Sequence, residues 1–96
     1  MKSLIVLISV LASFYSKPQN TASGEWFTGK EMTCAHKTLP MNTLVKVTRG
    51  RRSLVCRIND RGPYIKGRTL DLSRAAAAQL GMIDAGVARV EMEVLR

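Results

Sequence analysis

Residues 53–63 read SLVCRINDRGP, and this stretch decides how the chain folds. Its first seven residues place an apolar side chain at every second position, which is the pattern of a half-buried β-strand. Residues 43–48 (TLVKVT) alternate in the same way, and the basic turn RGRR at 49–52 joins the two segments. The pattern therefore predicts a β-hairpin that closes at Gly50.

Further signals lie on both sides of this hairpin. The turn DRGP at 60–63 ends it, because glycine and proline punctuate the chain. Residues 88–94 alternate apolar and charged side chains and predict the last strand. Ser73 is a good N-cap for a short alanine-rich helix over 74–80, and Gly81 is placed to end it. Shorter extended segments are expected at 12–16, 32–35 and 69–72.

The size and composition of the chain allow one globular domain. Its 96 residues supply one modest core, and 46% hydrophobic and 23% charged residues are ordinary for a globular protein. About six short strands with one or two short helices predict a mainly β fold. A small closed or nearly closed barrel fits this pattern, because closure removes exposed strand edges. We expect the domain to be a monomer.

The chain is strongly basic, with a formal net charge of +8. Such a protein is attracted to polyanions. Nucleic acid, anionic lipid and an anionic cell wall all qualify, and the charge alone does not choose among them. No apolar run reaches the roughly 18 residues needed to cross a bilayer, so no membrane span is expected.

Residues 1–12 have the pattern of an export signal. Lys2 supplies a positive start, residues 4–11 form a short apolar stretch, and residues 10–12 (VLA) offer a small-residue cleavage site. This division leaves residues 12–96 as the domain and argues against nucleic acid as the partner. The alternative is that the apolar stretch begins the first β-strand.

Four acidic side chains are candidates for carbohydrate chemistry: Glu25, Glu31, Asp60 and Asp71. Glycosidic cleavage needs a protonated acid at the leaving oxygen. Asp60 lies among arginines, which favour its ionised form, although a turn residue bonded to backbone amides is the alternative. Asp71 stands at a strand-to-helix junction, where a helix-start carboxylate is the alternative. Glu25 adjoins Trp26, and an apolar neighbour can raise the pKa of a proton donor; a surface charge is the alternative.

The histidine and the two cysteines leave several possibilities open. His36 is the only histidine, and its polar surroundings favour a role in a site over a structural one. Cys34, His36 and Cys56 lack the paired spacing of a metal site, so no metal is expected. No phosphate-cradling glycine loop is present, and no cofactor is expected. The cysteines pair only if their strands are neighbours; we favour two separate buried thiols.

Four motifs in order give the chain a specific resemblance. Residues 21–25 (TASGE), 32–40 (MTCAHKTLP), 57–63 (RINDRGP) and 67–77 (GRTLDLSRAAA) resemble the rare lipoprotein A family, the RlpA-like domain, over nearly the whole chain. The resemblance implies a six-stranded double-psi β-barrel. It also implies a bacterial lytic transglycosylase, exported to the periplasm or cell envelope, that cuts peptidoglycan glycan strands lacking stem peptides and leaves 1,6-anhydro-muramyl ends.

The resemblance also suggests which residues act. Glu25, His36, Asp60 and Asp71 match positions tied to activity or to the same groove. We expect the substrate to be bound by the following side chains: Ser23, Thr33, Arg57, Arg61, Tyr64 and Arg68.

Two departures from the family pattern bear on function. Thr28 stands where the family often has an aspartate, which leaves open a non-catalytic, glycan-binding module of wall remodelling. Cys34 replaces a small alanine and Cys56 an aliphatic residue, and this paired replacement implies a disulfide.

Overall fold

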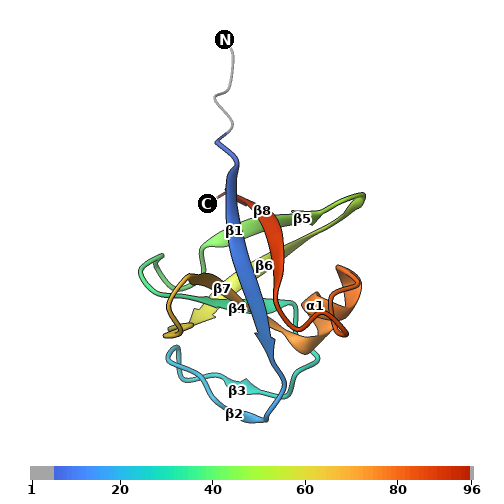
Figure 1. Ribbon diagram of the computed structural model, residues 1–96. Helices are drawn as coiled ribbons and strands as arrows, with labels where there is room; N and C mark the ends of the chain where they lie inside the picture. The colour runs from blue at the N-terminus through green and yellow to red at the C-terminus, as the bar shows by residue number, and fades with distance from the viewer. Residues whose placement is uncertain (1–5, 96) are drawn as a thin grey trace.

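A closed six-stranded β-barrel forms the body of the computed structural model, which describes residues 6–95 (Figure 1). The strands follow the order β1-β7-β4-β6-β5-β8 around the barrel. β1 pairs with β7, and β4 with β6, in parallel; the other neighbours are antiparallel. The predicted mainly β barrel is therefore confirmed. The strands are β1 (Ile8–Tyr15), β4 (Thr33–His36), β5 (Leu44–Arg49), β6 (Arg52–Asp60), β7 (Arg68–Ser73) and β8 (Ala88–Val94).

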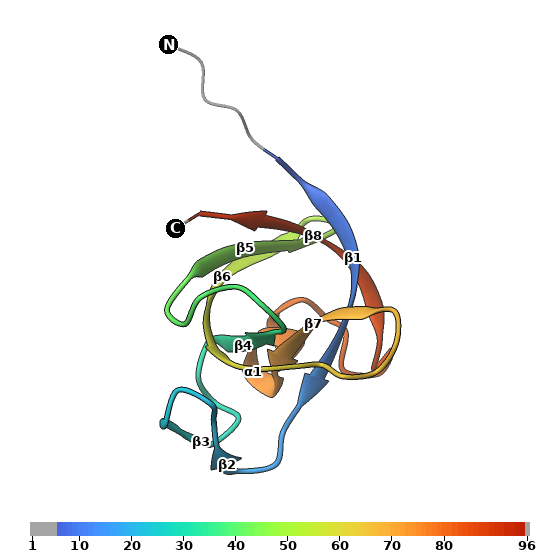
Figure 2. The same cartoon turned by 90° about the vertical axis from the view of Figure 1, so that its left-hand side faces the viewer.

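A small antiparallel ribbon lies outside the barrel. It consists of β2 (Gln19–Asn20) and β3 (Trp26–Phe27). The two views place it near the end of β1, at one end of the barrel (Figures 1 and 2). Phe27 is fully buried there, and its ring centroid lies 4.3 Å from that of Tyr15. The ribbon thus packs against Tyr15, the last residue of β1, in a small apolar contact outside the main core.

The predicted hairpin is present as β5 and β6. Its register pairs Val45 with Cys56 and Thr48 with Ser53. Gly50 has a φ of 61°, a left-handed conformation that glycine adopts without strain. The alternating pattern therefore located both strands and the turn between them.

The inner face of the barrel is apolar because successive residues of a strand point to opposite sides. Leu54, Cys56 and Ile58 of β6 point inward with exposed fractions of 7%, 1% and 0%. They join apolar residues from all the other barrel strands and from the segment after β7 in one core cluster. The outward positions of the same strands carry polar side chains such as Lys46 and Arg57, together with a few exposed apolar ones such as Val55.

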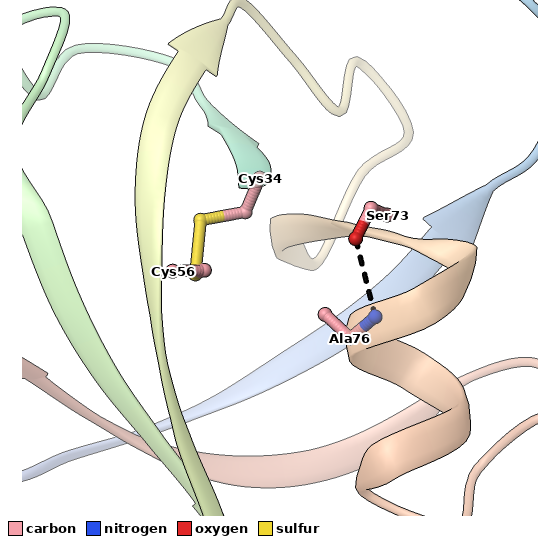
Figure 3. The surroundings of a disulfide bond; sticks show 4 residues. All are labelled: Cys34, Cys56, Ser73 and Ala76. Carbon is pink, nitrogen blue, oxygen red and sulfur yellow. Dashed lines mark hydrogen bonds between the residues drawn. A yellow bond between two sulfur atoms is a disulfide. The ribbon is translucent and has the colours of Figure 1, made fainter. Parts of the chain in front are cut away.

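A disulfide joins Cys34 of β4 to Cys56 of β6 inside this core (Figure 3). The two Cα atoms are 6.1 Å apart, and the residues are 22 positions apart in sequence. The interpretation of two separate thiols is therefore wrong, and the pairing implied by the double replacement is confirmed. Such a cross-link restricts the unfolded chain and stabilises the fold by about 3 kcal/mol. It also ties together two strands that carry polar residues on their outer faces.

The short helix α1 (Arg74–Gln79) forms where the sequence predicted it. The buried hydroxyl of Ser73 accepts a hydrogen bond from the Ala76 amide at 3.1 Å, as Figure 3 shows. Gly81, with a φ of 70°, follows the C-cap residue. The cap holds the helix at the end of β7, directly after the segment that contains Asp71.

The apolar start of the chain contributes to the barrel from residue 8 onward. β1 begins earlier than the expected 12–16, and residues 8–12 pair with β8. Val10 and Ala12 have exposed fractions of 7% and 0%. Residues 1–5 of the expected export signal lie outside the described residues. Within the described part of the chain, no helix is long and apolar enough to cross a membrane.

Candidate active site

The polar residues of interest gather on the outer face of the barrel, where β1, β4, β6 and β7 lie side by side. Their sequence neighbours Ala12, Cys34, Ile58 and Leu72 are buried in the core, so alternation turns the polar side chains next to them outward. Asp60 joins them at the end of β6, where the register between β4 and β6 shifts. The register places Ser13 of β1 and Ala35 of β4 on either side of Asp71. We call the following residues the polar cluster: Ser13, Tyr15, Thr33, Asn59, Asp60 and Asp71.

Asp71 is a half-buried carboxyl group at the centre of this row. The Ser13 hydroxyl donates a hydrogen bond to its Oδ1 at 2.9 Å. Burial raises the pKa of Asp71, and the negative charge of Asp60 raises it further. The Ser13 hydrogen bond and the charge of Arg68 act in the opposite direction without cancelling the rise. Asp71 is thus the acid in this site whose surroundings favour holding a proton.

Asp60 ends β6 and holds the loop between β2 and β3 against it. Its Oδ1 accepts hydrogen bonds from the backbone amides of Ala22 at 2.8 Å and Arg61 at 2.9 Å. The amide of Ser23 also donates to the Asn59 carbonyl at 3.1 Å. The alternative reading of Asp60 as a turn residue bonded to amides therefore describes part of its role. The same bonds hold its charge close enough to raise the pKa of Asp71.

Glu25 is held in a bidentate ion pair with Arg57. The guanidinium donates to Oε1 at 2.9 Å and to Oε2 at 2.8 Å. Ser23 adds a hydrogen bond to Oε1 at 3.1 Å. These contacts, the Arg57 hydrogen bond first, lower the pKa of Glu25 to about 2. The expectation that Trp26 would raise this pKa is therefore wrong, because an arginine 32 residues away in sequence dominates.

His36 braces the loop that follows β4. Its Nδ1 accepts from the amides of Thr38 and Leu39, each at 3.1 Å. Arg61 donates to the carbonyls of His36 at 3.1 Å and Leu39 at 2.8 Å, so it holds the same loop. Burial, then the charges of Arg61 and Lys37, lower the pKa of His36. Among the described residues, His36 makes no hydrogen bond to Glu25, Asp60 or Asp71.

Thr28 and Glu31 form a closed loop next to the ribbon. The Glu31 carboxylate accepts from the Thr28 amide at 3.1 Å, the Thr28 hydroxyl at 2.8 Å and the Gly29 amide at 3.2 Å. Burial acts to raise the pKa of Glu31, but hydrogen bonds from its own segment outweigh burial and lower it. Thr28, which departs from the family pattern, thus belongs to a loop whose amides and hydroxyl bind the carboxylate of Glu31.

The remaining predicted substrate contacts differ in accessibility. The Tyr64 side chain is 77% exposed in the loop between β6 and β7. Arg68 lies near enough to Asp71 for its charge to act on that carboxyl. The Thr33 hydroxyl, in contrast, is buried near Tyr15 and has no hydrogen-bond partner of good geometry in the described part of the chain. The predicted substrate contacts thus include both exposed and buried polar groups.

Reasoning from the sequence missed Ser13 and Tyr15. Both lie on β1, two residues apart, and Ser13 touches Asp71 directly. The signal was available in the alternation of residues 12–16, where polar side chains occupy every second position. Neither residue is an acid, and a hydroxyl side chain on a strand is also typical of an ordinary exposed surface.

Two solved structures share the fold of this chain. The Streptomyces papain inhibitor matches with a TM-score of 0.81 at 21% identity, covering 95% of this chain and 96% of that one. An expansin from Clavibacter michiganensis matches with a TM-score of 0.78 at 19% identity, covering 95% of this chain and 51% of that one. The fold is therefore the double-psi β-barrel that the resemblance implied.

Sequence comparison then identifies the family. The lytic transglycolase family model matches residues 8–92, and the chain belongs to this family. The endolytic peptidoglycan transglycosylase RlpA of Pasteurella multocida is 50% identical over 91 residues, which are 90% of this chain and 31% of that protein. The probable RlpA transglycosylase of a Nostoc species is 52% identical over 92 residues, 88% of this chain and 25% of that protein. The chain thus spans about a quarter to a third of these curated relatives.

Proposed function

We propose that this domain is an endolytic lytic transglycosylase, a carbon–oxygen lyase that cuts peptidoglycan glycan strands lacking stem peptides. The observation that carries the proposal is the raised pKa of Asp71, half-buried beside Asp60, in a chain of the lytic transglycolase family. Glycosidic cleavage requires a carboxylic acid that gives its proton to the leaving oxygen, and a raised pKa favours the protonated form of such an acid. The relatives' names, which state peptidoglycan transglycosylase activity, support the choice of substrate.

In the proposed reaction, Asp71 first gives a proton to the substrate and later takes one back from it. Asp71 gives its proton to the glycosidic oxygen as the bond from that oxygen to the muramyl C1 breaks. The negative charge of Asp60 stabilises the positive charge that develops on the sugar. The C6 hydroxyl of the same sugar then bonds to C1 and returns its proton to Asp71. The product is a 1,6-anhydro sugar, and no water is consumed.

Other side chains bind and orient the strand in this proposal. Glu25 is ionised, so it acts with Arg57 as a polar contact for sugar hydroxyls instead of a proton donor. His36 carries its proton on Nε2, because Nδ1 accepts two amides, and it offers that N–H to the substrate. The remaining substrate contacts are the predicted ones: Ser23, Thr33, Arg61, Tyr64 and Arg68.

We propose that the protein acts in the cell envelope after export. The disulfide supports this location, because such bonds persist outside the reducing cytosol. The position of signal cleavage stays a prediction. Cleavage after Ala12 would remove residues 8–12, which pair with β8. Mass spectrometry of the exported protein's N-terminus would decide whether these residues are retained.

Product analysis tests the proposed activity. The purified protein is incubated with glycan strands whose stem peptides have been removed by an amidase, and with intact peptidoglycan. We expect anhydro-muramyl ends, detected by mass as products lacking one water, from the stripped strands only. No anhydro product under conditions in which a full-length RlpA transglycosylase is active would overturn the proposal.

The departure at Thr28 favours a second candidate, a glycan-binding module without turnover. Thr28 is bound to Glu31 and does not present an acid where the family often has one. This candidate predicts that the protein sediments with purified sacculi and releases no product. Restoring the acid with Thr28→Asp would then produce turnover, whereas the first candidate expects turnover without this change.

A further inference from the structure

Tyr15 lies on the same outer face as the proposed proton donor. It follows Ser13 by two residues on β1, and Ser13 donates to Asp71. In the parallel pairing of β1 with β7, Tyr15 stands opposite Ser73, two residues beyond Asp71. Residues two apart on a strand share a face, so the Tyr15 side chain lies on the same face as Ser13, next to the Ser13–Asp71 hydrogen bond along β1.

The position of the Tyr15 ring is set by packing. Its centroid is 4.3 Å from that of Phe27, with 37° between the ring planes. Phe27 is fully buried and belongs to the ribbon outside the barrel. The contact fixes the ring without involving the hydroxyl, so the hydroxyl is not needed to hold the side chain in place.

The Tyr15 hydroxyl is buried near the Thr33 hydroxyl, whose hydrogen-bonding acts to lower the pKa of Tyr15, but neither hydroxyl has a hydrogen-bond partner of good geometry among the described residues. A buried hydroxyl without a partner is unfavourable and rare in folded proteins. The charged groups that act on it are Asp60, Asp71 and Glu31, all of them acids. Burial first, and then these charges, raise the pKa of Tyr15, so the phenol keeps its proton. It is a buried hydrogen-bond donor close enough to Asp60, Asp71 and Glu31 for their charges to act on it.

We propose that Tyr15 is a positioning residue whose hydroxyl donates a hydrogen bond to Asp71 when Asp71 is ionised. The proposal rests on the proposed function, in which Asp71 gives its proton to the glycosidic oxygen. At that point Asp71 becomes an anion beside Asp60, with Ser13 and Arg68 as its other favourable neighbours. The phenol O–H stabilises this anion until the sugar's C6 hydroxyl returns the proton. No proton leaves Tyr15.

Tyr15→Phe removes the hydroxyl and retains the ring that packs on Phe27. Because the donor favours ionised Asp71, its loss is expected to raise the pKa of Asp71 by about one unit. The measurement is an NMR titration of the Asp71 carboxyl carbon in the wild type and the variant. Tyr64→Phe is the matched control, since it removes the same atom from an exposed tyrosine and is expected to leave this pKa unchanged. An unchanged Asp71 pKa in Tyr15→Phe would overturn the proposal.

Kinetics on stripped glycan strands give a second readout. In Tyr15→Phe we expect kcat to fall about tenfold with KM unchanged, because the weaker acid protonates the leaving oxygen less readily. The limb on which activity falls with rising pH should move to higher pH, and the melting temperature should stay within a degree or two. A lower melting temperature with an unmoved limb would show a structural role and reject the proposal. The titration needs no turnover, so it decides the role of Tyr15 even if the proposed activity is absent.

Discussion

Glu25 and Asp71 are carboxyl groups of the same domain with opposite electrostatic surroundings. Glu25 lies in a loop, and a bidentate arginine lowers its pKa to about 2. Asp71 lies on a barrel strand, where burial and Asp60 raise its pKa. The comparison shows that the position of a carboxyl group relative to arginine and solvent decides the direction in which its pKa shifts. In the proposed function, Glu25 is accordingly a fixed anion and Asp71 the proton carrier.

The largest expected effect comes from removing the proton carrier. Asp71→Asn retains the shape of the side chain and its contact with Ser13 but cannot give up a proton. We expect activity on stripped glycan strands to fall by about 10²- to 10⁴-fold, the usual worth of a general acid. Asp84→Asn, which changes an exposed loop acid, is the control and should retain activity. If Glu25→Gln lost as much activity as Asp71→Asn, the division of roles would be wrong.

A smaller effect is expected from the hydroxyl that orients the proton carrier. Ser13→Ala removes the 2.9 Å hydrogen bond to Asp71. Since this bond acts to lower the pKa of Asp71, its loss should raise that pKa. A hydrogen bond of this kind is worth about 1 kcal/mol, so kcat should fall roughly five- to tenfold. Steady-state kinetics across pH would measure both changes. Unaltered kinetics would show that strand packing alone orients Asp71.

The sequence predicted those parts of the fold that depend on local pattern. Alternating residues located β5, β6 and β8, and Ser73 with Gly81 located the ends of α1. These features depend on neighbouring residues only, so a single sequence contains them. The pairing of Cys34 with Cys56 required the family resemblance, because only the fold shows that β4 and β6 are neighbours.

The features that escaped prediction depend on distant contacts. The apolar residues at the start of the chain have the composition of both an export signal and a buried strand, and the structure shows the strand for residues 8–12. The charge state of Glu25 depends on Arg57, which the sequence places far from it. Trp26, its neighbour in sequence, is 58% exposed, and the hydrogen bond from Arg57 outweighs desolvation in setting the pKa of Glu25.

Breaking the ion pair is expected to have a modest effect. Glu25→Gln and Arg57→Gln each remove one charge from a partly exposed pair. A double-mutant cycle measured by urea unfolding should give a coupling free energy of about 0.2–1 kcal/mol, because solvent screens such pairs. Activity of Glu25→Gln should fall less than tenfold. A coupling well above this range would mean that the pair is enclosed more tightly than its exposed fractions of 34% and 44% indicate.

The smallest effect is the separate pH dependence that each acid gives to stability. Glu25 has a folded pKa of about 2 and an ordinary value of 4.5, so its contribution is present above pH 4.5 and is lost as the pH falls toward 2. Asp71 has a folded pKa above its ordinary 3.8, so its contribution is present below pH 3.8 and is lost as the pH rises through the folded value. Unfolding free energies of the wild type, Glu25→Gln and Asp71→Asn, measured between pH 2 and pH 8, separate the two. Glu25→Gln should flatten the loss of stability at acidic pH, and Asp71→Asn should flatten the loss as the pH rises through the raised pKa of Asp71. The same change in both variants would show that the two carboxyl groups titrate together, which their different neighbours do not allow.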